Sequence, residues 1–354
     1  MKLIRILLLI SCCISTLAPA KNKLDFPILF WNVENLFDCK HDSLKNDYDF
    51  LPEALKHWTP FRYKQKLRNI AKTIITTSKW TPPAIIGLCE VENDAVISDL
   101  TQQSILKNLE YRYICTQSKD ERGIDVALLY LPERFKVIQH QAINIGKLPN
   151  GRVTRDILYV EGFTASADTL DLFIVHLPSR YGGKRKSEPN RIFVANKLKQ
   201  QIEQIKKKKG QSAKLIIMGD FNDYPHNASI VKILQAKEPS IPILESKLYH
   251  LLARKRRQHD WGTYKYKSEW GVLDHFIING NLLINDSFYT SEENTEIIRA
   301  SFLLEEDPKY GGYKPFRTYN GMHYLGGYSD HLPILSTFTK VVSNYSLILI
   351  LLSS

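Results

Sequence analysis

Short apolar segments, each long enough for one buried strand, alternate along this 354-residue chain with segments of helical periodicity. The predicted strands cover residues 26–31, 84–89, 125–130, 170–175, 214–218, 273–278 and 332–338. The predicted helices cover residues 62–78, 93–106 with Asn93 as cap, 188–205 and 227–234. Apolar strands separated by helices indicate a layered α/β domain. Several strands between residues 111 and 175 follow one another without a helix, so we expect mixed or antiparallel sheets packed face to face, with helices outside.

The first twenty residues have the pattern of an export signal. Lys2 and Arg5 precede an apolar run, and residues 18–20 (APA) offer small side chains for cleavage. Residues 9–12 (LISC) also resemble a bacterial lipobox, in which Cys12 would be lipidated and would attach the protein to a membrane. Two alternatives therefore stay open: a soluble exported protein, periplasmic or secreted, and an envelope-anchored lipoprotein. Residues 341–354 form an apolar tail without an assigned role.

Charge and cysteine content narrow the classes of function. The formal net charge of +11 suits an anionic partner such as nucleic acid, a phosphorylated sugar or a membrane surface. Only Cys39, Cys89 and Cys115 lie beyond the signal, and neither a CxxC nor an HExxH motif is present. These features argue against a disulfide scaffold and against a zinc site.

Polar side chains recur where the predicted strands begin or end. They are Asn32, Glu34, Glu90, Glu92, Asp125, His176, Asp220, Asn222, Asp223, Asp274, Asp330 and His331. Hard oxygen ligands suit Mg²⁺, Mn²⁺ or Ca²⁺. A carboxylate can activate water, and a histidine held by a carboxylate can stabilise charge on phosphoryl oxygens. The pattern therefore predicts a metal-dependent hydrolase of phosphate esters.

Seven short motifs, taken in order, resemble the motif series of the endonuclease/exonuclease/phosphatase superfamily. They are residues 30–36 (FWNVENL), 89–92 (CEVE), 122–127 (RGIDVA), 176–179 (HLPS), 219–223 (GDFND), 273–275 (LDH) and 328–333 (YSDHLP). That superfamily includes DNase I, exonuclease III, neutral sphingomyelinases and inositol polyphosphate 5-phosphatases. The resemblance implies one domain over residues 21–340 with the DNase I-like fold, a four-layer α/β sandwich of two mixed sheets flanked by helices.

The resemblance also implies a metal site. Glu90 would be the main ligand of Mg²⁺, or of Mn²⁺ or Ca²⁺, with Asn32 beside it and Asp330 in support.

The catalytic roles follow from the same motifs. Asp220 would orient or deprotonate the attacking water, and Asn222 would steady the water and the phosphate. His331 would face the scissile phosphate, oriented by Asp274, and His176 would be a second catalytic histidine. Together these groups describe in-line attack of water on phosphorus.

Other residues are expected to support the site or to bind substrate. The candidate substrate-binding residues are Arg180, Lys184 and Arg185 in the segment RYGGKRK, and Arg317 in a segment rich in Tyr and Gly before Asp330. The first segment has the alternative interpretation of a solvated loop. The candidate supporting residues are Asp125, which can instead anchor its strand, and Arg155, which lies on a predicted strand and can instead pair with a carboxylate. Glu34, Glu92 and Asp223 are expected to be structural, and His275 to point away from Asp274.

Three functions fit the sequence. The positive charge and the Arg/Lys clusters favour an exported phosphodiesterase that acts as a nuclease. The alternative is a phosphomonoesterase, or a diesterase acting on lipids or small molecules, with the same metal site. The third is a non-catalytic surface-binding protein, which the loss of Asp220, Asn222 or His331 would have supported; all three residues are present. Oligomeric state is not encoded in any of these features.

Overall fold

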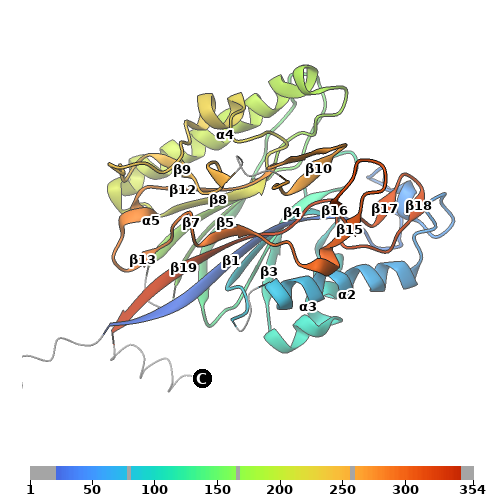
Figure 1. Cartoon of the computed structure of the whole chain (residues 1–354), viewed down its shortest axis with the longest axis horizontal. Coiled ribbons are helices and arrows are strands. Elements are labelled where there is room, and N and C mark those ends of the chain that lie inside the picture. Colours follow the sequence, from blue (N-terminus) through green and yellow to red (C-terminus); the bar gives the residue numbers. More distant parts are fainter. Residues whose placement is uncertain (1–20, 78–80, 165–167, 256–259, 344–354) are drawn as a thin grey trace, which may run out of the picture.

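The computed structural model describes residues 21–77, 81–164, 168–255 and 260–343, which form two β-sheets packed face to face between helices (Figure 1). The first sheet has the order β13-β19-β1-β2-β4-β3, with β14 also paired to β19, and the second has the order β5-β6-β7-β8-β12-β9. Both sheets mix parallel and antiparallel pairs, since β1 is parallel to β2 and β7 to β8. The predicted four-layer α/β sandwich is therefore confirmed.

The strands of the first sheet are β1 (Lys21–Leu36), β2 (Ile85–Val91), β3 (Arg112–Cys115), β4 (Asp125–Tyr130), β13 (Phe288–Tyr289), β14 (Thr295–Ile297) and β19 (Ile334–Ser343). Those of the second sheet are β5 (Phe135–Ile143), β6 (Ile157–Thr164), β7 (Thr169–His176), β8 (Leu215–Asp220), β9 (Leu248–His250) and β12 (Asp274–Asn279). Three hairpins are formed by β10 (Tyr264–Tyr266) with β11 (Glu269–Gly271), β15 (Leu304–Glu306) with β16 (Tyr313–Pro315), and β17 (Tyr319–Asn320) with β18 (His323–Tyr324).

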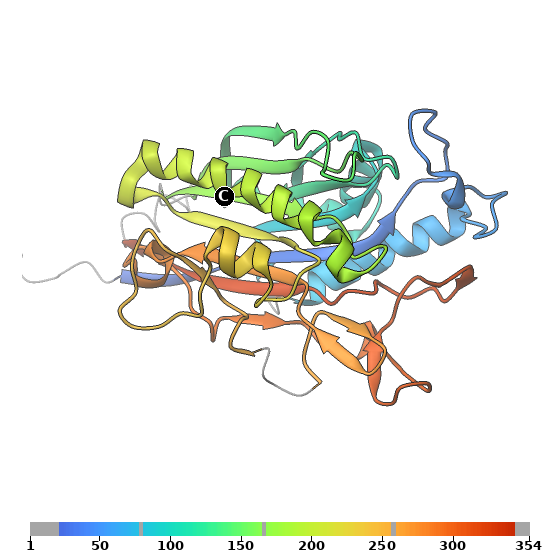
Figure 2. The ribbon, with the colours of Figure 1, turned by 90° about the horizontal axis from the view of Figure 1, so that it is seen from above.

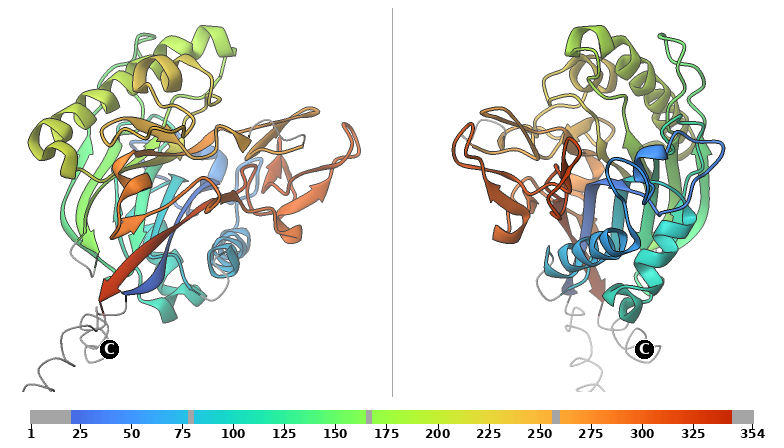
Figure 3. Two further views of the ribbon diagram at one scale, coloured as in Figure 1. Left: turned by 60° about the vertical axis from the view of Figure 1, so that its left-hand side comes forward. Right: turned by 90° about the vertical axis from the view of Figure 1, so that its right-hand side faces the viewer.

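Helices cover the outer face of each sheet. Figures 2 and 3 show α4 (Lys184–Lys209) running across the second sheet, while α2 (Pro60–Thr77) lies on the opposite side of the molecule. The outer layers also contain α3 (Asp94–Gln102), the short α5 (Asn281–Ile284), the π-helix η4 (Ser229–Leu234) and the 3₁₀ turns η1 (Tyr48–Phe50), η2 (Ile105–Leu109), η3 (Gly210–Ser212) and η6 (Ser301–Leu303). Among the described residues, no helix combines the length and the hydropathy needed to cross a membrane.

The core lies on both faces of the central strands. Residues 28–31 of β1 expose no surface at all, which is the pattern of a strand covered on both sides. Between the two sheets the Met218 side chain of β8 packs directly over Gly87 of β2, because a Cβ added to that glycine would lie 3.1 Å from it. A second apolar cluster, which includes Phe173, Leu198 and Ile217, fills the space between the second sheet and α4.

Several predicted boundaries shift in the structure. Asn93 caps α3 as predicted, with its side chain accepting a hydrogen bond from the Val96 N–H, but the helix ends at Gln102 instead of residue 106. There Ser104 accepts a hydrogen bond from the Leu106 N–H and starts the separate turn η2. The predicted signal at residues 1–20, including Cys12, lies outside the described residues, as do residues 344–354, while β19 continues to Ser343.

Candidate active site

Three neighbouring strands of the second sheet place polar side chains at one end of the sheet. His176 at the end of β7 is paired with Asp220 at the end of β8, and Asp220 is paired with Asp274 at the start of β12. Directly paired residues point to the same face of a sheet, so the strand register alone brings these three side chains together. Asn32 reaches them from β1 of the facing sheet, since its Nδ2 donates a hydrogen bond to Asp220 Oδ2 over 3.1 Å.

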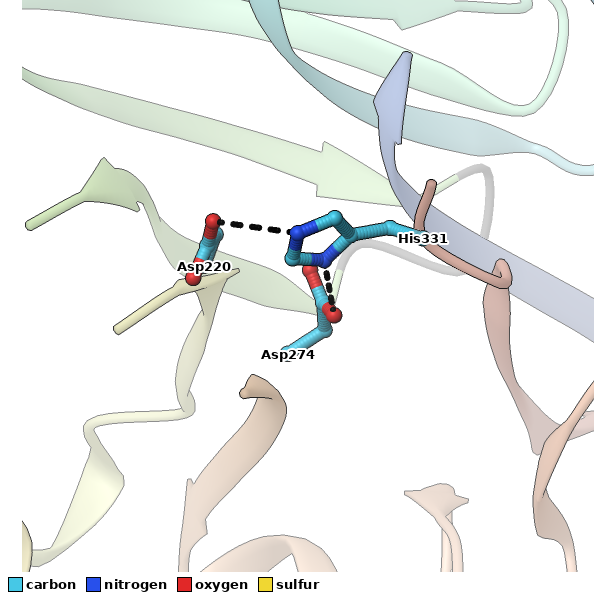
Figure 4. Close-up of side chains that lie close together, drawn as sticks. All are labelled: Asp220, Asp274 and His331. Atoms are coloured by element: carbon cyan, nitrogen blue, oxygen red, sulfur yellow. Dashed lines mark hydrogen bonds and ion pairs between the residues drawn. The ribbon is translucent and has the colours of Figure 1, made fainter. Parts of the chain in front are cut away.

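His331 lies between the two aspartates (Figure 4). Its Nδ1 is 2.7 Å from Asp274 Oδ2, and its Nε2 is 3.9 Å from Asp220 Oδ2. All three side chains are buried, with His331 6% exposed and each aspartate 1%. Burial lowers the pKa of His331, but the carboxylates of Asp274 and Asp220 outweigh it and hold that pKa well above its usual value. Burial raises the pKa of Asp220, which the nearby imidazolium partly offsets.

The turn before β19 that carries His331 is fixed by contacts with β1. The Trp31 Nε1 donates a hydrogen bond to the His331 carbonyl oxygen at 2.8 Å, and the Ser329 hydroxyl donates to the Asn32 carbonyl oxygen at 2.6 Å. The Tyr264 ring packs against the imidazole at a centroid distance of 5.0 Å. Hydrogen bonds therefore fix the backbone around His331, while the Tyr264 ring packs against its imidazole.

Glu90 is aimed into the site by an irregularity in the sheet. The register shifts in β1 between Asn32 and Leu36 and in β2 between Cys89 and Val91. Glu90 itself has a left-handed backbone with φ of 61°, which strains a non-glycine residue and is typical of functional positions. Its Oε2 accepts a hydrogen bond from the Asn35 N–H, and its Oε1 lies 3.9 Å from the His176 Nε2.

The donor atoms fit a hard divalent cation. Asp274 Oδ1 is buried and has no hydrogen-bond partner among the described residues, and ligand atoms of Asp220, Asp274 and His331 lie within 4.8 Å of one another. That group could hold a metal ion, yet one of its three members is a histidine and hard cations favour oxygen ligands. The carboxylate of Glu90, with the amide of Asn32 beside Asp220, therefore remains the more suitable ligand set.

His176 is the second histidine of the site. Its Nε2 lies 3.6 Å from Asp220 Oδ2, and its side chain is buried. Burial lowers its pKa well below the usual value, and the charges of Arg155 and Arg122 lower it further. The imidazole is consequently neutral near pH 7 and can exchange hydrogen bonds with either carboxylate neighbour.

Asn222 occupies a tight turn directly after β8. Its φ is 48°, its N–H donates to Asp220 Oδ1 at 2.8 Å, and its side-chain amide donates to the Leu177 carbonyl oxygen. Arg180 closes the turn, because its Nε donates to the Asn222 carbonyl oxygen while its guanidinium lies 4.1 Å from the centre of the Tyr224 ring. The structure thus places Arg180 beside the catalytic turn, with its guanidinium engaged by protein groups.

The other predicted substrate-binding residues lie apart from one another. The Lys184 ammonium lies 5.6 Å from the centre of the Tyr224 ring, and Arg185 is exposed on the first turn of α4. Arg317 makes an ion pair of 3.0 Å with Asp330 and another of 3.5 Å with Glu34. The charge of Arg317 is therefore matched by two carboxylates.

Asp330 belongs to a charge cluster next to the site, in which Glu34 and Lys66 are buried and Arg317 and Asp330 are half-buried. Besides Arg317 and Glu34, the cluster contains Lys66 of α2, whose ammonium donates hydrogen bonds to Thr318 Oγ1 and to the Tyr328 carbonyl oxygen. Burial lowers the pKa of Lys66 to about 8, although the carboxylates of Glu34 and Asp330 act in the opposite direction. The structure places Asp330 against Arg317, while its neighbour His331 faces Asp274.

Asp125 and Arg155 are found in their structural alternatives. Asp125 accepts hydrogen bonds from the Thr116 hydroxyl and the Ser118 N–H, which anchor the start of β4. The prediction of a strand at Arg155 is wrong, because β6 begins only at Ile157 and Arg155 lies in the preceding loop. Its guanidinium lies 3.4 Å from Asp120 and donates a hydrogen bond to the His176 carbonyl oxygen, so it pairs with a carboxylate while supporting His176 from behind.

Residues beyond the predicted set also shape the site. Lys66 lies on the same buried face of α2 as Leu67, Ile70 and Ile74, and a lysine at that spacing is the signal that could have revealed it. Tyr264 carries no comparable sequence signal, since only the pairing of the β10 hairpin with His331 brings it to the site. The expected structural role of Asp223 agrees with its buried ion pair to Arg191 at 2.8 Å, and His275 turns to the Asp223 carbonyl oxygen, away from His331.

A model of the protein family described as "Endonuclease/Exonuclease/phosphatase family" matches residues 27–340 of the chain. No curated protein matches the chain significantly.

Solved structures share the fold at low sequence identity. An endonuclease/exonuclease/phosphatase family protein from Bacteroides thetaiotaomicron is 13% identical with a TM-score of 0.57, over 91% of this chain and 97% of that one. TDP2 from D. rerio, complexed with single strand DNA product, is 15% identical with a TM-score of 0.55, over 89% and 98%. A mannosyl-6-phosphatase from Bacteroides thetaiotaomicron is 14% identical with a TM-score of 0.54, over 90% and 99%.

Proposed function

The chain belongs to the endonuclease/exonuclease/phosphatase family, whose members hydrolyse phosphoester bonds with a divalent metal ion, and we propose that it is an exported nuclease that cleaves phosphodiester bonds. The observation that carries the catalytic part of this proposal is the buried pair of His331 and Asp274 facing Asp220. The preference for nucleic acid rests on the net charge of +11 and on the cations of the segment 180–186 beside the site.

The proton of the attacking water goes to Asp220. Hydrogen bonds from the Asn222 N–H and the Asn32 amide fix the orientation of this carboxylate. The raised pKa of Asp220 makes the carboxylate a stronger base than an exposed aspartate. Water held against Asp220 is thereby oriented and partly deprotonated as it attacks phosphorus.

Charge that develops on the phosphoryl oxygens is stabilised by His331. Since Asp274 favours the imidazolium form, the Nε2–H remains available as a positively charged donor. Glu90 and Asn32 would hold a divalent cation, which would supply Lewis-acid stabilisation of the same charge. His176, neutral and directly beside Asp220, positions that carboxylate without adding a charge.

A phosphomonoesterase is the second candidate. Its support is the similarity to the mannosyl-6-phosphatase, which has nearly the same TM-score as the similarity to the TDP2 complex. One metal site of this kind serves many phosphate esters, so substrate choice depends on the surface around it.

Hydrolysis assays on four substrates test the proposal. The chain without its predicted signal, residues 21–354, is incubated with Mg²⁺ or EDTA and with plasmid DNA, RNA, bis-p-nitrophenyl phosphate or p-nitrophenyl phosphate. Metal-dependent cleavage of a nucleic acid that is lost in His331→Ala supports a nuclease. Cleavage of the monoester alone would replace the nuclease by a phosphomonoesterase, and cleavage of the small diester alone would replace it by a small-molecule diesterase.

Export is tested separately. Fractionation of cells that make the full chain should place it outside the cytoplasm, and Cys12→Ala should release it from the membrane fraction only if the chain is a lipoprotein. A chain that stays in the cytoplasm would contradict the localisation without affecting the chemistry.

A further inference from the structure

A groove of about 660 Å³ opens next to the catalytic residues. It lies between residues 120–122, the loop at 150–155 and the segment 178–190. Arg155 connects the groove to the site, because this residue lines the groove and its guanidinium donates hydrogen bonds to the carbonyl oxygens of His176 and Leu177. A substrate that extends beyond the scissile phosphate on this side would therefore enter the groove.

The lining of the groove carries an excess of positive charge. Its charged residues are the cations Arg122, Arg152, Arg155 and Lys186 and the carboxylates Asp120 and Glu121. The Asp120 carboxylate is matched by Arg155 at 3.4 Å and by Arg122 at 3.7 Å. Arg152 and Lys186 are exposed, and neither makes an ion pair within the described part of the chain. These two cations remain available to an anionic ligand.

The N-terminus of α4 forms one wall of the groove. Its cap, Gly183, offers no side-chain hydrogen bond, and the first turn contains Lys184, Arg185 and Lys186 without any acidic residue. The free N–H groups and the dipole already make a helix N-terminus positive, so three cations there repel it instead of stabilising it. A bound phosphate would relieve this repulsion.

An unsatisfied polar group in the opposite wall independently indicates a ligand. Thr154 lines the groove and is only 5% exposed, and its hydroxyl has no hydrogen-bond partner among the described residues. A buried hydroxyl without a partner is unfavourable, and a turn of this side chain toward the groove would let it donate to a phosphate oxygen bound there.

An aromatic ring lies in the same groove. Tyr181 lines it and is 82% exposed, so its ring is open to a ligand in the groove. Exposed rings beside cations are typical of single-strand sites, where unpaired bases stack while the cations follow the backbone. This ring distinguishes a polynucleotide from other chains of phosphate groups.

We infer that the groove binds the nucleotide next to the scissile bond of a single-stranded polynucleotide, with its phosphate between Arg152 and Lys186 and its base on Tyr181. The inference rests on the proposed nuclease function and specifies its substrate. The sequence had indicated the segment 180–186, but neither Arg152 nor Thr154 carried a signal of its own.

Binding of a fluorescent single strand of about 12 nucleotides, measured by anisotropy in EDTA, tests the groove without cleavage. The double variant Arg152→Ala/Lys186→Ala should raise Kd about tenfold. It should also reduce the slope of log Kd against log salt, between about 50 and 200 mM, by about 1.4, since each phosphate contact on a single strand contributes about 0.7. The matched control Lys207→Ala/Lys208→Ala removes the same charge from the other end of α4 and should keep the wild-type slope.

A separate pair of variants tests the role of Tyr181. Tyr181→Ala should raise the Kd for the oligonucleotide about tenfold and leave competition by inorganic polyphosphate unchanged, whereas Tyr181→Phe should bind like wild type. Equal binding by Tyr181→Ala and wild type would overturn the assignment to polynucleotide. Equal slopes in the two double variants would overturn the groove as a phosphate site.

Failure of the proposed nuclease function and failure of the groove as a binding site give different results. A wild type that binds through the groove in EDTA but cleaves neither DNA nor RNA with Mg²⁺ contradicts the nuclease and supports the groove. A wild type that cleaves nucleic acid, while binding is indifferent to Arg152, Lys186 and Tyr181, supports the nuclease and overturns the groove.

Discussion

Replacing Asp274 by asparagine should remove the charge that favours the imidazolium of His331 while retaining the size of the side chain and a hydrogen-bond acceptor. The two groups are 2.7 Å apart and both are buried. At an effective dielectric constant of about 20, opposite unit charges at that distance attract each other by about 6 kcal/mol. The asparagine dipole recovers up to about half of this. We therefore expect transition-state stabilisation to fall by about 3–6 kcal/mol, which is a loss in kcat of about 10²- to 10⁴-fold.

The assay is the steady-state hydrolysis of bis-p-nitrophenyl phosphate with saturating Mg²⁺, together with urea unfolding of each variant. The matched control is Asp168→Asn, which makes the same chemical change at a buried aspartate paired with Lys214 and outside the catalytic cluster. The control should lose some stability and keep its kcat. If Asp274→Asn retains kcat within about threefold of wild type, the role assigned to the pair of Asp274 and His331 is refuted.

Three further perturbations follow from the structure. EDTA should abolish turnover. In a metal titration, Glu90→Gln should raise the Mg²⁺ concentration for half-maximal activity at least about tenfold. An unchanged half-maximal Mg²⁺ concentration would remove Glu90 from the ligand set. The pKa of Lys66 is lowered from 10.5 to about 8, so between these pH values the unfolded chain binds more protons than the folded one. The unfolding free energy of the wild type should therefore rise by about 3 kcal/mol as the pH increases through this range. Lys66→Met should lack that rise in urea unfolding, and a parallel rise in both proteins would contradict the lowered pKa. A Cβ on Gly219 would lie 2.2 Å from the Val175 carbonyl oxygen, so Gly219→Ala should lose about 3 kcal/mol of unfolding free energy. Gly87→Ala meets side chains instead of backbone, those of Met218 and Phe30 at 3.1 Å, and should lose about 1 kcal/mol; equal losses would show that the strands adjust.

The layers and most of the central strands could be predicted because their residues are apolar on both faces. β4 has the predicted bounds, and β8 differs by one residue at its start and two at its end. β5 had no such signal, since six of its nine residues are exposed and four of these are polar, and only pairing with β6 makes it a strand. Hydrophobic pattern therefore predicts buried strands and misses those at the edge of a sheet.

The candidate site was predictable where strand register determines it. His176, Asp220 and Asp274 lie at the same edge of the sheet on adjacent strands, so the pairing of these strands is sufficient to bring the three side chains together. The pairing of Arg317 with Asp330 and Glu34 depends on a loop conformation that no local pattern encodes. For the same reason the sequence could not separate cations that already have partners from those that face the groove.

The pairing of the first strand with the last has a consequence for how the protein is made. β19 lies between β1 and β13, with Lys21 opposite Ser343, so β1 keeps one edge unpaired, and β13 and β14 cannot join the first sheet, until the end of the domain has left the ribosome. Pairings so distant along the chain form slowly, so this edge is the last part of the first sheet to close. Because His331 precedes β19, a fragment that stops before residue 331 lacks the imidazole proposed to face the phosphate. The candidate site is thus complete only when nearly the whole domain has been synthesised.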